Sequence, residues 1–143
     1  MTMRLPALAT AHSHAFQRAL RGATQRPGPA GTDDFWSWRT AMYALADALT
    51  PESIQSISRV AFDELYRAGV RTVGEFHYVH HQPGGAPYED RTELASRVVA
   101  AARAAGLRVC LLRVVYARAG AGRPPEGAQR RFSDASLDAA LAD

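Results

Sequence analysis

Helix-like and strand-like segments alternate along the chain, and this alternation restricts the fold more than any other feature of the sequence. Apolar residues recur at helical spacing in three stretches, 35–45, 54–68 and 94–102. Three short apolar runs predict strands at 3–11, 70–76 and 107–116. Strands that alternate with helices pair in parallel, because the crossover helix returns the chain to the same end of the sheet. The pattern therefore predicts the α/β fold class.

Local signals predict where the helices begin and end. Thr50 is an N-cap candidate, Pro51 suits the first helical position, and Glu52 suits the positive end of the helix dipole. Gly69 follows the last apolar position and predicts the C-terminal stop. The remaining boundaries are predicted at Asp33 or Asp34, at a capping box of Asp90 and Glu93, at Gly106, and at a last helix that begins near Asp134. The Gly- and Pro-rich stretch 22–32 predicts a loop.

Three strands are too few for a complete β/α barrel, which has eight strands and about 250 residues. The segments 68–73 and 105–110 resemble each other, as successive βα units do. We therefore expect residues 1–143 to be the amino-terminal portion of a (β/α)8 TIM-barrel domain, with only its first three βα units. An open parallel sheet has an unpaired edge and an uncovered apolar face, so we also expect the isolated chain to self-associate.

Composition excludes several classes of protein. Apolar residues make up 47% of the chain, enough for a packed core, and no run is long enough for a membrane span. No secretory signal stands out at 1–11, so a cytoplasmic location is expected. The net charge is +3, but the basic residues, all arginine, are interleaved with acids, which argues against a nucleic-acid partner. The single cysteine, Cys110, lies in an apolar run and is expected to be buried.

The five histidines fall into two clusters, each at the end of a predicted strand. In the first, His12 and His14 are two positions apart, and alternate residues of an extended chain point to the same side. Two imidazoles so placed can bind one metal ion at the carboxyl end of a barrel strand, where active sites lie. The alternative is that the two histidines are exposed by chance and have no function.

The second cluster, HYVHH, occupies positions 77–81 at the end of the next strand, directly after Glu75 and Phe76. Its position corresponds to that of the first cluster, at the mouth of a barrel. The alternative is a polar loop whose histidines are hydrogen-bonded. No catalytic role is assigned to His77, His80 or His81.

Several longer motifs narrow the interpretation. They are HSHAFQRALRG at 12–22, FWSWR at 35–39 followed by Met42 and Tyr43, GEFHYVHH at 74–81, and PPEG with QRRF at 124–127 and 129–132. Together they resemble the formimidoylglutamate deiminase family of the amidohydrolase superfamily, from about Leu5 to Phe132. The resemblance implies that the partial TIM barrel is of the metal-dependent amidohydrolase type.

The resemblance also implies functions for particular residues. His12 and His14 match two zinc ligands of the family, and Gln17 and Tyr78 match residues that contact the substrate. The family hydrolyses a small molecule, N-formimino-L-glutamate, to N-formyl-L-glutamate and ammonia during histidine degradation. It uses one divalent metal ion, zinc, although histidine ligands also suit other transition metals. Its full-length members imply a homodimer.

The chain also departs from the family. The other metal ligands, the general acid and base and a substrate-binding arginine lie on later strands in the family, and the small β domain before the first strand has no counterpart here. We therefore expect the chain alone to be inactive unless a partner completes the barrel. Three alternatives remain: another deaminase or cyclic-amide hydrolase of the superfamily, a non-catalytic remnant, and a histidine-based metal-binding module.

Overall fold

Three parallel strands form the sheet in the computed structural model, which describes residues 6–25 and 34–142. The strands β1 (Leu8–Thr10), β2 (Val70–His77) and β3 (Arg108–Arg113) lie side by side in that order. Pairing between β2 and β3 places Gly74 opposite Cys110 and Phe76 opposite Leu112. The parallel α/β arrangement predicted from the alternation of segments is confirmed.

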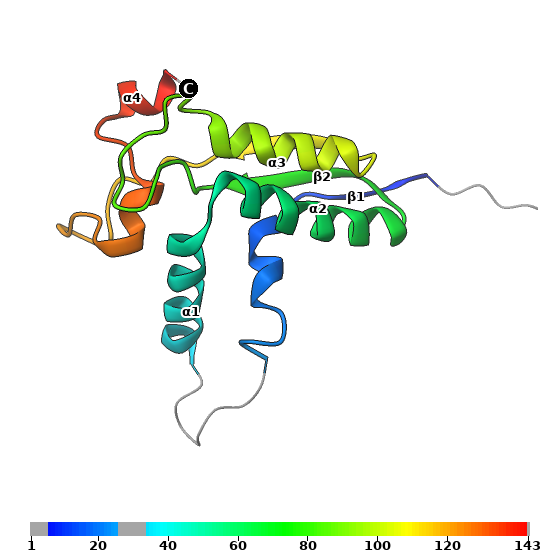
Figure 1. Cartoon of the computed structure of the whole chain (residues 1–143), viewed down its shortest axis with the longest axis horizontal. Helices are drawn as coiled ribbons and strands as arrows, with labels where there is room; N and C mark the ends of the chain where they lie inside the picture. Colours follow the sequence, from blue (N-terminus) through cyan, green and yellow to red (C-terminus); the bar gives the residue numbers. More distant parts are fainter. Residues whose placement is uncertain (1–5, 26–33, 143) are drawn as a thin grey trace, which may run out of the picture.

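Helices cover one face of this sheet. The helices α2 (Pro51–Arg67) and α3 (Glu93–Ala104) run along it, while α1 (Phe35–Ala48) and the 3₁₀ helix η1 (Ala15–Leu20) project from it beside each other (Figure 1). A second 3₁₀ helix, η2 (Gly127–Phe132), and the short α4 (Leu137–Leu141) follow β3. Among the described residues, no helix combines the length and apolar character needed to cross a membrane.

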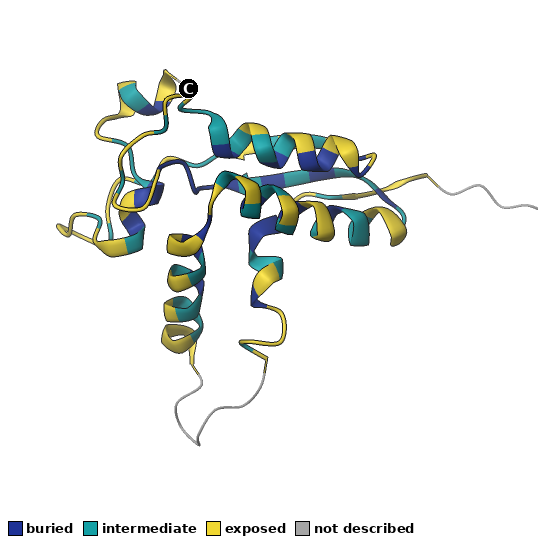
Figure 2. Cartoon of the chain, in the orientation of Figure 1, coloured by how far each residue is buried: buried dark blue, intermediate teal, exposed yellow. Residues whose placement is uncertain are grey.

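The core lies between α2, α3 and β2. Ile54, Phe62, Val73, Leu94 and Val98 are at most 1% exposed, and the helix sides that face the sheet form the buried surface in Figure 2. Burial of side chains of this size stabilises the fold by about 1.5–3 kcal/mol each. Apolar packing therefore stabilises the contact of α2 and α3 with β2, the central strand of the sheet.

The predicted helix starts are confirmed where the signals are local. Asp34 caps α1 by accepting hydrogen bonds from the backbone N–H groups of Trp36 and Ser37, both at 2.9 Å. Thr50 caps α2 in the same way through Ser53 N–H at 3.1 Å, with Pro51 at the first helical position. Asp33, the other cap candidate for α1, lies outside the described residues, as does most of the predicted loop 22–32.

The predicted capping box of Asp90 and Glu93 is wrong, and the last helix begins three residues after Asp134. Thr92 precedes α3, and the Asp90 carboxylate accepts from the Thr92 N–H and hydroxyl, both at 2.8 Å, instead of forming a capping box with Glu93. The last helix begins at Leu137 after a Ser136 cap, because the Asp134 carboxylate is occupied by a buried ion pair.

The third strand differs from its prediction in length and burial. It ends at Arg113, three residues before the predicted end, and its residues alternate between partly buried and exposed instead of being covered on both faces. Cys110 is exposed, so the predicted buried thiol is wrong. The reason is that β3 is an edge strand, and the face that carries Cys110 and Leu112 has no helix over it.

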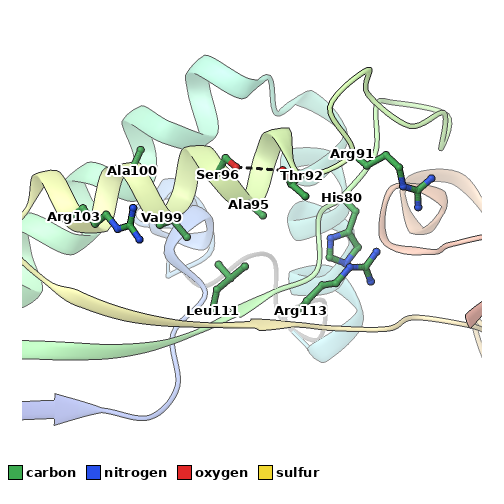
Figure 3. Close-up of a pocket in the computed structure, with 10 residues that line it drawn as sticks. All are labelled: His80, Arg91, Thr92, Ala95, Ser96, Val99, Ala100, Arg103, Leu111 and Arg113. Atoms are coloured by element: carbon green, nitrogen blue, oxygen red, sulfur yellow. Dashed lines mark hydrogen bonds between the residues drawn. The ribbon is translucent and has the colours of Figure 1, made fainter. Parts of the chain in front are cut away.

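A groove of about 450 Å³ lies between α3 and the outer side of β3. Ala95, Val99 and Leu111 make an apolar floor, and Figure 3 shows the His80 ring beside the Arg113 guanidinium at one end. A helix that packs over β3 in a longer barrel would lie against such a floor.

Candidate metal and substrate site

The first histidine pair follows β1, at the carboxyl end of the sheet. The rings of His12 and His14 lie on the same side of the chain, with centroids 4.6 Å apart and planes nearly perpendicular. Their Nε2 atoms are 3.0 Å apart. The spacing of two residues therefore brings two imidazole nitrogens to one point, as the sequence predicts.

One contact determines which ring nitrogen of His14 carries the hydrogen. Its Nδ1 lies 3.1 Å from the backbone carbonyl oxygen of Phe76, and a carbonyl can only accept, so Nδ1 carries the hydrogen. The lone pair is then on Nε2, the atom that faces His12. Burial is the largest influence on His14 and lowers its pKa; the contact with Phe76 opposes this, and His12 adds to it. The ring is therefore neutral at pH 7, which is the form that binds metals.

The pair fits part of a metal site. Two nitrogens bound to one tetrahedral zinc ion at about 2.0–2.1 Å lie roughly 3.3 Å apart, close to the separation seen here. Within residues 6–25 and 34–142, no group of three or more histidine, cysteine, aspartate or glutamate side chains could hold a metal ion. The assignment of His12 and His14 as ligands stays a prediction, and the pair would supply two of the three ligands that a catalytic zinc ion usually has.

Gln17 and Tyr78, the two predicted substrate contacts, lie together although they are 61 residues apart. The Gln17 side-chain amide donates to the Tyr78 hydroxyl at 2.9 Å, and that hydroxyl donates to the sulfur of Met42 at 3.5 Å. Burial raises the pKa of Tyr78 to about 12, so the hydroxyl keeps its proton at neutral pH. With His14, both residues border one cavity of about 310 Å³.

The cavity has an aromatic wall that the sequence analysis did not assign. Its other lining residues come from α1, β2, η2 and the segment after β3: Trp38, Met42, Tyr43, Phe76, Val114, Tyr116 and Phe132. Arg39 and Gln129 both donate to the Tyr43 hydroxyl, at 2.8 and 3.0 Å. The aromatic motif at 35–39 with Met42 and Tyr43 was a signal for this wall, since Trp38 and Met42 are one helical turn apart.

The second histidine cluster belongs to the core. His77, His80 and His81 are each at most 4% exposed, and none of them lines the cavity. His80 Nε2 lies 2.9 Å from Val114 O, and His81 Nε2 lies 3.2 Å from the Asp134 carboxylate. The alternative of hydrogen-bonded histidines thus describes these two residues, although the loop is buried and not a polar surface.

Burial also changes the acid–base behaviour of this cluster. Burial, with smaller contributions from the neighbouring His80 and Arg113, lowers the pKa of His77 to about 3. It lowers the pKa of His80 to about 4, against the opposing hydrogen bond to Val114. Both rings are therefore neutral at pH 7. Their protonation at lower pH would lower the stability of the fold, because each charge would be buried.

The sequence model of the Amidohydrolase family matches residues 3–142. The chain is 44% identical over 133 residues to formimidoylglutamate deiminase of Pseudomonas aeruginosa. These residues are 92% of this chain and 29% of that protein. It is 31% identical over 81 residues to 8-oxoguanine deaminase of the same organism, over 57% of this chain and 17% of that protein.

A solved structure agrees with the fold. The crystal structure of an amidohydrolase from Brucella melitensis superposes with a TM-score of 0.76 at 42% identity, over 90% of this chain and 29% of that one. A partial TIM barrel is therefore shown. The chain spans less than a third of the length of these relatives.

Proposed function

Because the chain belongs to the amidohydrolase family, we propose that it is the amino-terminal portion of a metal-dependent hydrolase that converts N-formimino-L-glutamate to N-formyl-L-glutamate and ammonia. The observation that carries the proposal is the cavity bordered jointly by His14, Gln17 and Tyr78. It would bring the proposed metal ligand His14 together with polar groups that can hold a small substrate. Its volume, about 310 Å³, is at the lower end of the range for small-molecule sites.

His12 and His14 would hold the metal ion through their adjacent Nε2 atoms. A bound zinc ion supplies hydroxide at neutral pH by lowering the pKa of its water towards about 7. The chain's own contribution is to keep His14 neutral and to orient its ring through the Phe76 carbonyl. Such a hydrogen bond on the second ring nitrogen fixes which nitrogen faces the metal.

Gln17 and Tyr78 would hold the substrate. The Gln17 amide retains a free carbonyl oxygen and a second N–H, and the Tyr78 hydroxyl keeps its proton, so both can bind a polar substrate group. The aromatic wall of Trp38, Tyr43 and Phe132 would exclude water from the substrate. Exclusion of water strengthens each of these polar interactions.

The site is incomplete in the described part of the chain, which offers two ligands. We therefore propose that the 143-residue chain is inactive by itself and that the remaining barrel strands supply the other ligands and the general acid and base. The completed protein would be a homodimer, as the family resemblance implies, and would work in the cytoplasm, as expected from the sequence. Sedimentation of the completed protein tests the dimer.

The function is tested by ammonia release from N-formimino-L-glutamate. The chain is compared with a chimera in which the Pseudomonas aeruginosa deiminase supplies the rest of the barrel, each with and without added zinc. We expect activity in the chimera alone, and its loss in His12→Asn and His14→Asn chimeras. Activity of the isolated chain would contradict the proposal that its site is incomplete. An inactive but folded chimera would contradict N-formimino-L-glutamate as the substrate.

The similarity to 8-oxoguanine deaminase favours a second candidate, a deaminase of the same family that acts on a cyclic substrate. Replacement of Gln17 distinguishes the two candidate functions. If the first proposal holds, Gln17→Ala in the chimera raises KM for N-formimino-L-glutamate because a polar contact is lost. Unchanged kinetics, together with turnover of 8-oxoguanine, would favour the second candidate.

A further inference from the structure

A buried carboxylate of β2 lies next to the turn that carries the histidine pair. Glu75 is 2% exposed, on the helix-covered side of β2, and its Oε1 accepts a hydrogen bond from the Ala15 N–H at 2.8 Å. Burial raises the pKa of this carboxyl group, and Ala15 and the nearby side chain of Ser13 oppose the rise. Glu75 therefore binds the residue after His14 and lies close to the residue before it.

The neighbours of Glu75 hold the same turn through the backbone. Phe76 N–H donates to Ser13 O at 2.8 Å, and Phe76 O accepts from His14 Nδ1. A Cβ atom at Gly74 would lie 2.7 Å from Ala11 O, so only glycine permits this approach of β1 to β2. Three consecutive residues of β2 thus contact the chain from residue 11 to residue 15.

These contacts constrain the metal-facing atoms. His14 is held by its ring at Phe76, by the backbone before it at Ser13, and by the backbone after it at Ala15. The Glu75 carboxyl oxygen is the acceptor for the buried Ala15 N–H, a backbone donor that must be paired inside the protein. Without the carboxylate, the Ala15 N–H would lose its acceptor, and the turn would have more freedom to rotate both imidazoles.

We propose that Glu75 is a positioning residue that holds the His12–Ser13–His14 turn in the shape that binds the metal ion, an inference that rests on the proposed metal site. It acts through the Ala15 N–H and has no part in binding the metal or the substrate directly. Groups that orient metal ligands typically change metal affinity by about 10- to 100-fold when they are removed.

The test measures zinc affinity of the 143-residue chain by calorimetry for wild type, Glu75→Leu and Glu75→Gln. Leucine has a similar shape but accepts no hydrogen bond, so the Kd should rise by about 10-fold or more. Glutamine still accepts from Ala15 N–H, so its Kd should stay within about threefold of wild type. Ile54→Val, a buried α2 change far from the turn in sequence, controls for general destabilisation.

A metal-free readout separates this inference from the metal assignment. Ring ¹⁵N shifts report the His14 tautomer, and amide exchange reports the Ala15 N–H. We expect Glu75→Leu to give a mixture of His14 tautomers and faster exchange of the Ala15 N–H. Both changes are expected even if the wild-type chain binds no zinc. That combination would support the positioning role, and the metal ligands are then tested by the His12→Asn and His14→Asn chimeras.

An unchanged Kd, tautomer and amide exchange in folded Glu75→Leu would overturn the inference. If that variant does not fold, Ser13→Ala is measured in its place, because Ser13 is only half-buried and its hydroxyl lies close to the Glu75 carboxylate. A smaller loss of zinc affinity and a mixed His14 tautomer are expected for it. Wild-type values for both would overturn the positioning role.

Discussion

Arg131 shows how one residue can join distant parts of the fold. It is 0% exposed, and its guanidinium donates to four backbone carbonyls, those of Ala46, Asp47, Leu49 and His81. These acceptors lie in the end of α1, the corner before α2 and the loop after β2. Arg131 thereby fixes the segment that carries Phe132 to the wall of the cavity.

Replacing Arg131 with methionine should lower the free energy of unfolding by about 3 kcal/mol or more, since each buried carbonyl left unpaired costs about 1–3 kcal/mol. Urea denaturation followed by circular dichroism measures the loss. Arg130→Met is the matched control, because Arg130 is exposed and its change should stay within about 0.5 kcal/mol. Equal effects of the two substitutions would contradict the role of Arg131.

The buried histidines should make stability depend on pH. The pKa values of His77 and His80 are about 3 and about 4 in the folded chain, below the 6.5 of an unperturbed histidine, so the unfolded chain binds protons first. Their contribution to stability is complete above pH 6.5 and is lost as the pH falls towards 4. Between pH 7 and 5.5, we expect a loss of about 1 kcal/mol per histidine.

Urea denaturation at the two pH values measures this loss. His77→Leu should reduce the pH dependence, because one of the two protonation sites is removed. Equal stability of the wild-type chain at pH 7 and 5.5 would show that neither ring is held neutral.

The site could be predicted only where its residues stand close in sequence or within a motif. The two-residue spacing of His12 and His14 predicts their shared direction, and the structure shows it. The motif resemblance named Gln17 and Tyr78, which do meet. Phe132 and Tyr116 were missed as wall residues, because their approach depends on how the segments after β3 fold back.

At the scale of elements, boundaries set by local hydrogen bonds were predictable, and those set by distant partners were not. The caps of α1 and α2 lie within three residues of the groups they bind. Asp134, by contrast, pairs with Arg113 at 2.9 Å and with His81, so it could not begin a helix. The burial of β3 depends on strands and helices outside its own sequence.

The contact of β1 with β2 gives a prediction for Gly74. In Gly74→Ala, the new methyl group would meet Ala11 O at 2.7 Å, so the strands must separate. We expect a loss of about 1–3 kcal/mol in stability, by urea denaturation. Gly120→Ala places its methyl group in open space and should cost less than about 0.5 kcal/mol. A Gly74→Ala chain as stable as wild type would show that β1 moves freely.

At the scale of the whole molecule, the sheet has one covered and one open face. Cys110 is exposed and Leu112 is 42% exposed on the open face, which would line the inside of a closed barrel. Within residues 6–25 and 34–142, β1 and β3 are the edge strands of the sheet, and edge strands can pair with another chain. Both features favour contact between copies of the chain.

We therefore expect the isolated chain to sediment as oligomers at micromolar concentration. Leu112→Lys should shift it towards the monomer, because a charge on the open face opposes association. Leu141→Lys is the matched control: Leu141 is 73% exposed on α4, away from the sheet. A monomeric wild-type chain, or an equal effect of both substitutions, would contradict association through the open face.

The dependence of the first histidine pair on β2 has a consequence for the order of events during synthesis. The Ala15 N–H and the Glu75 carboxylate that accepts its hydrogen bond are 60 residues apart. At about 5–20 residues per second, translation needs roughly 3 to 12 seconds to pass from one to the other. During that interval the histidines emerge from the ribosome without the strand that shapes them. If His12 and His14 hold the metal ion as proposed, metal loading must follow the emergence of β2.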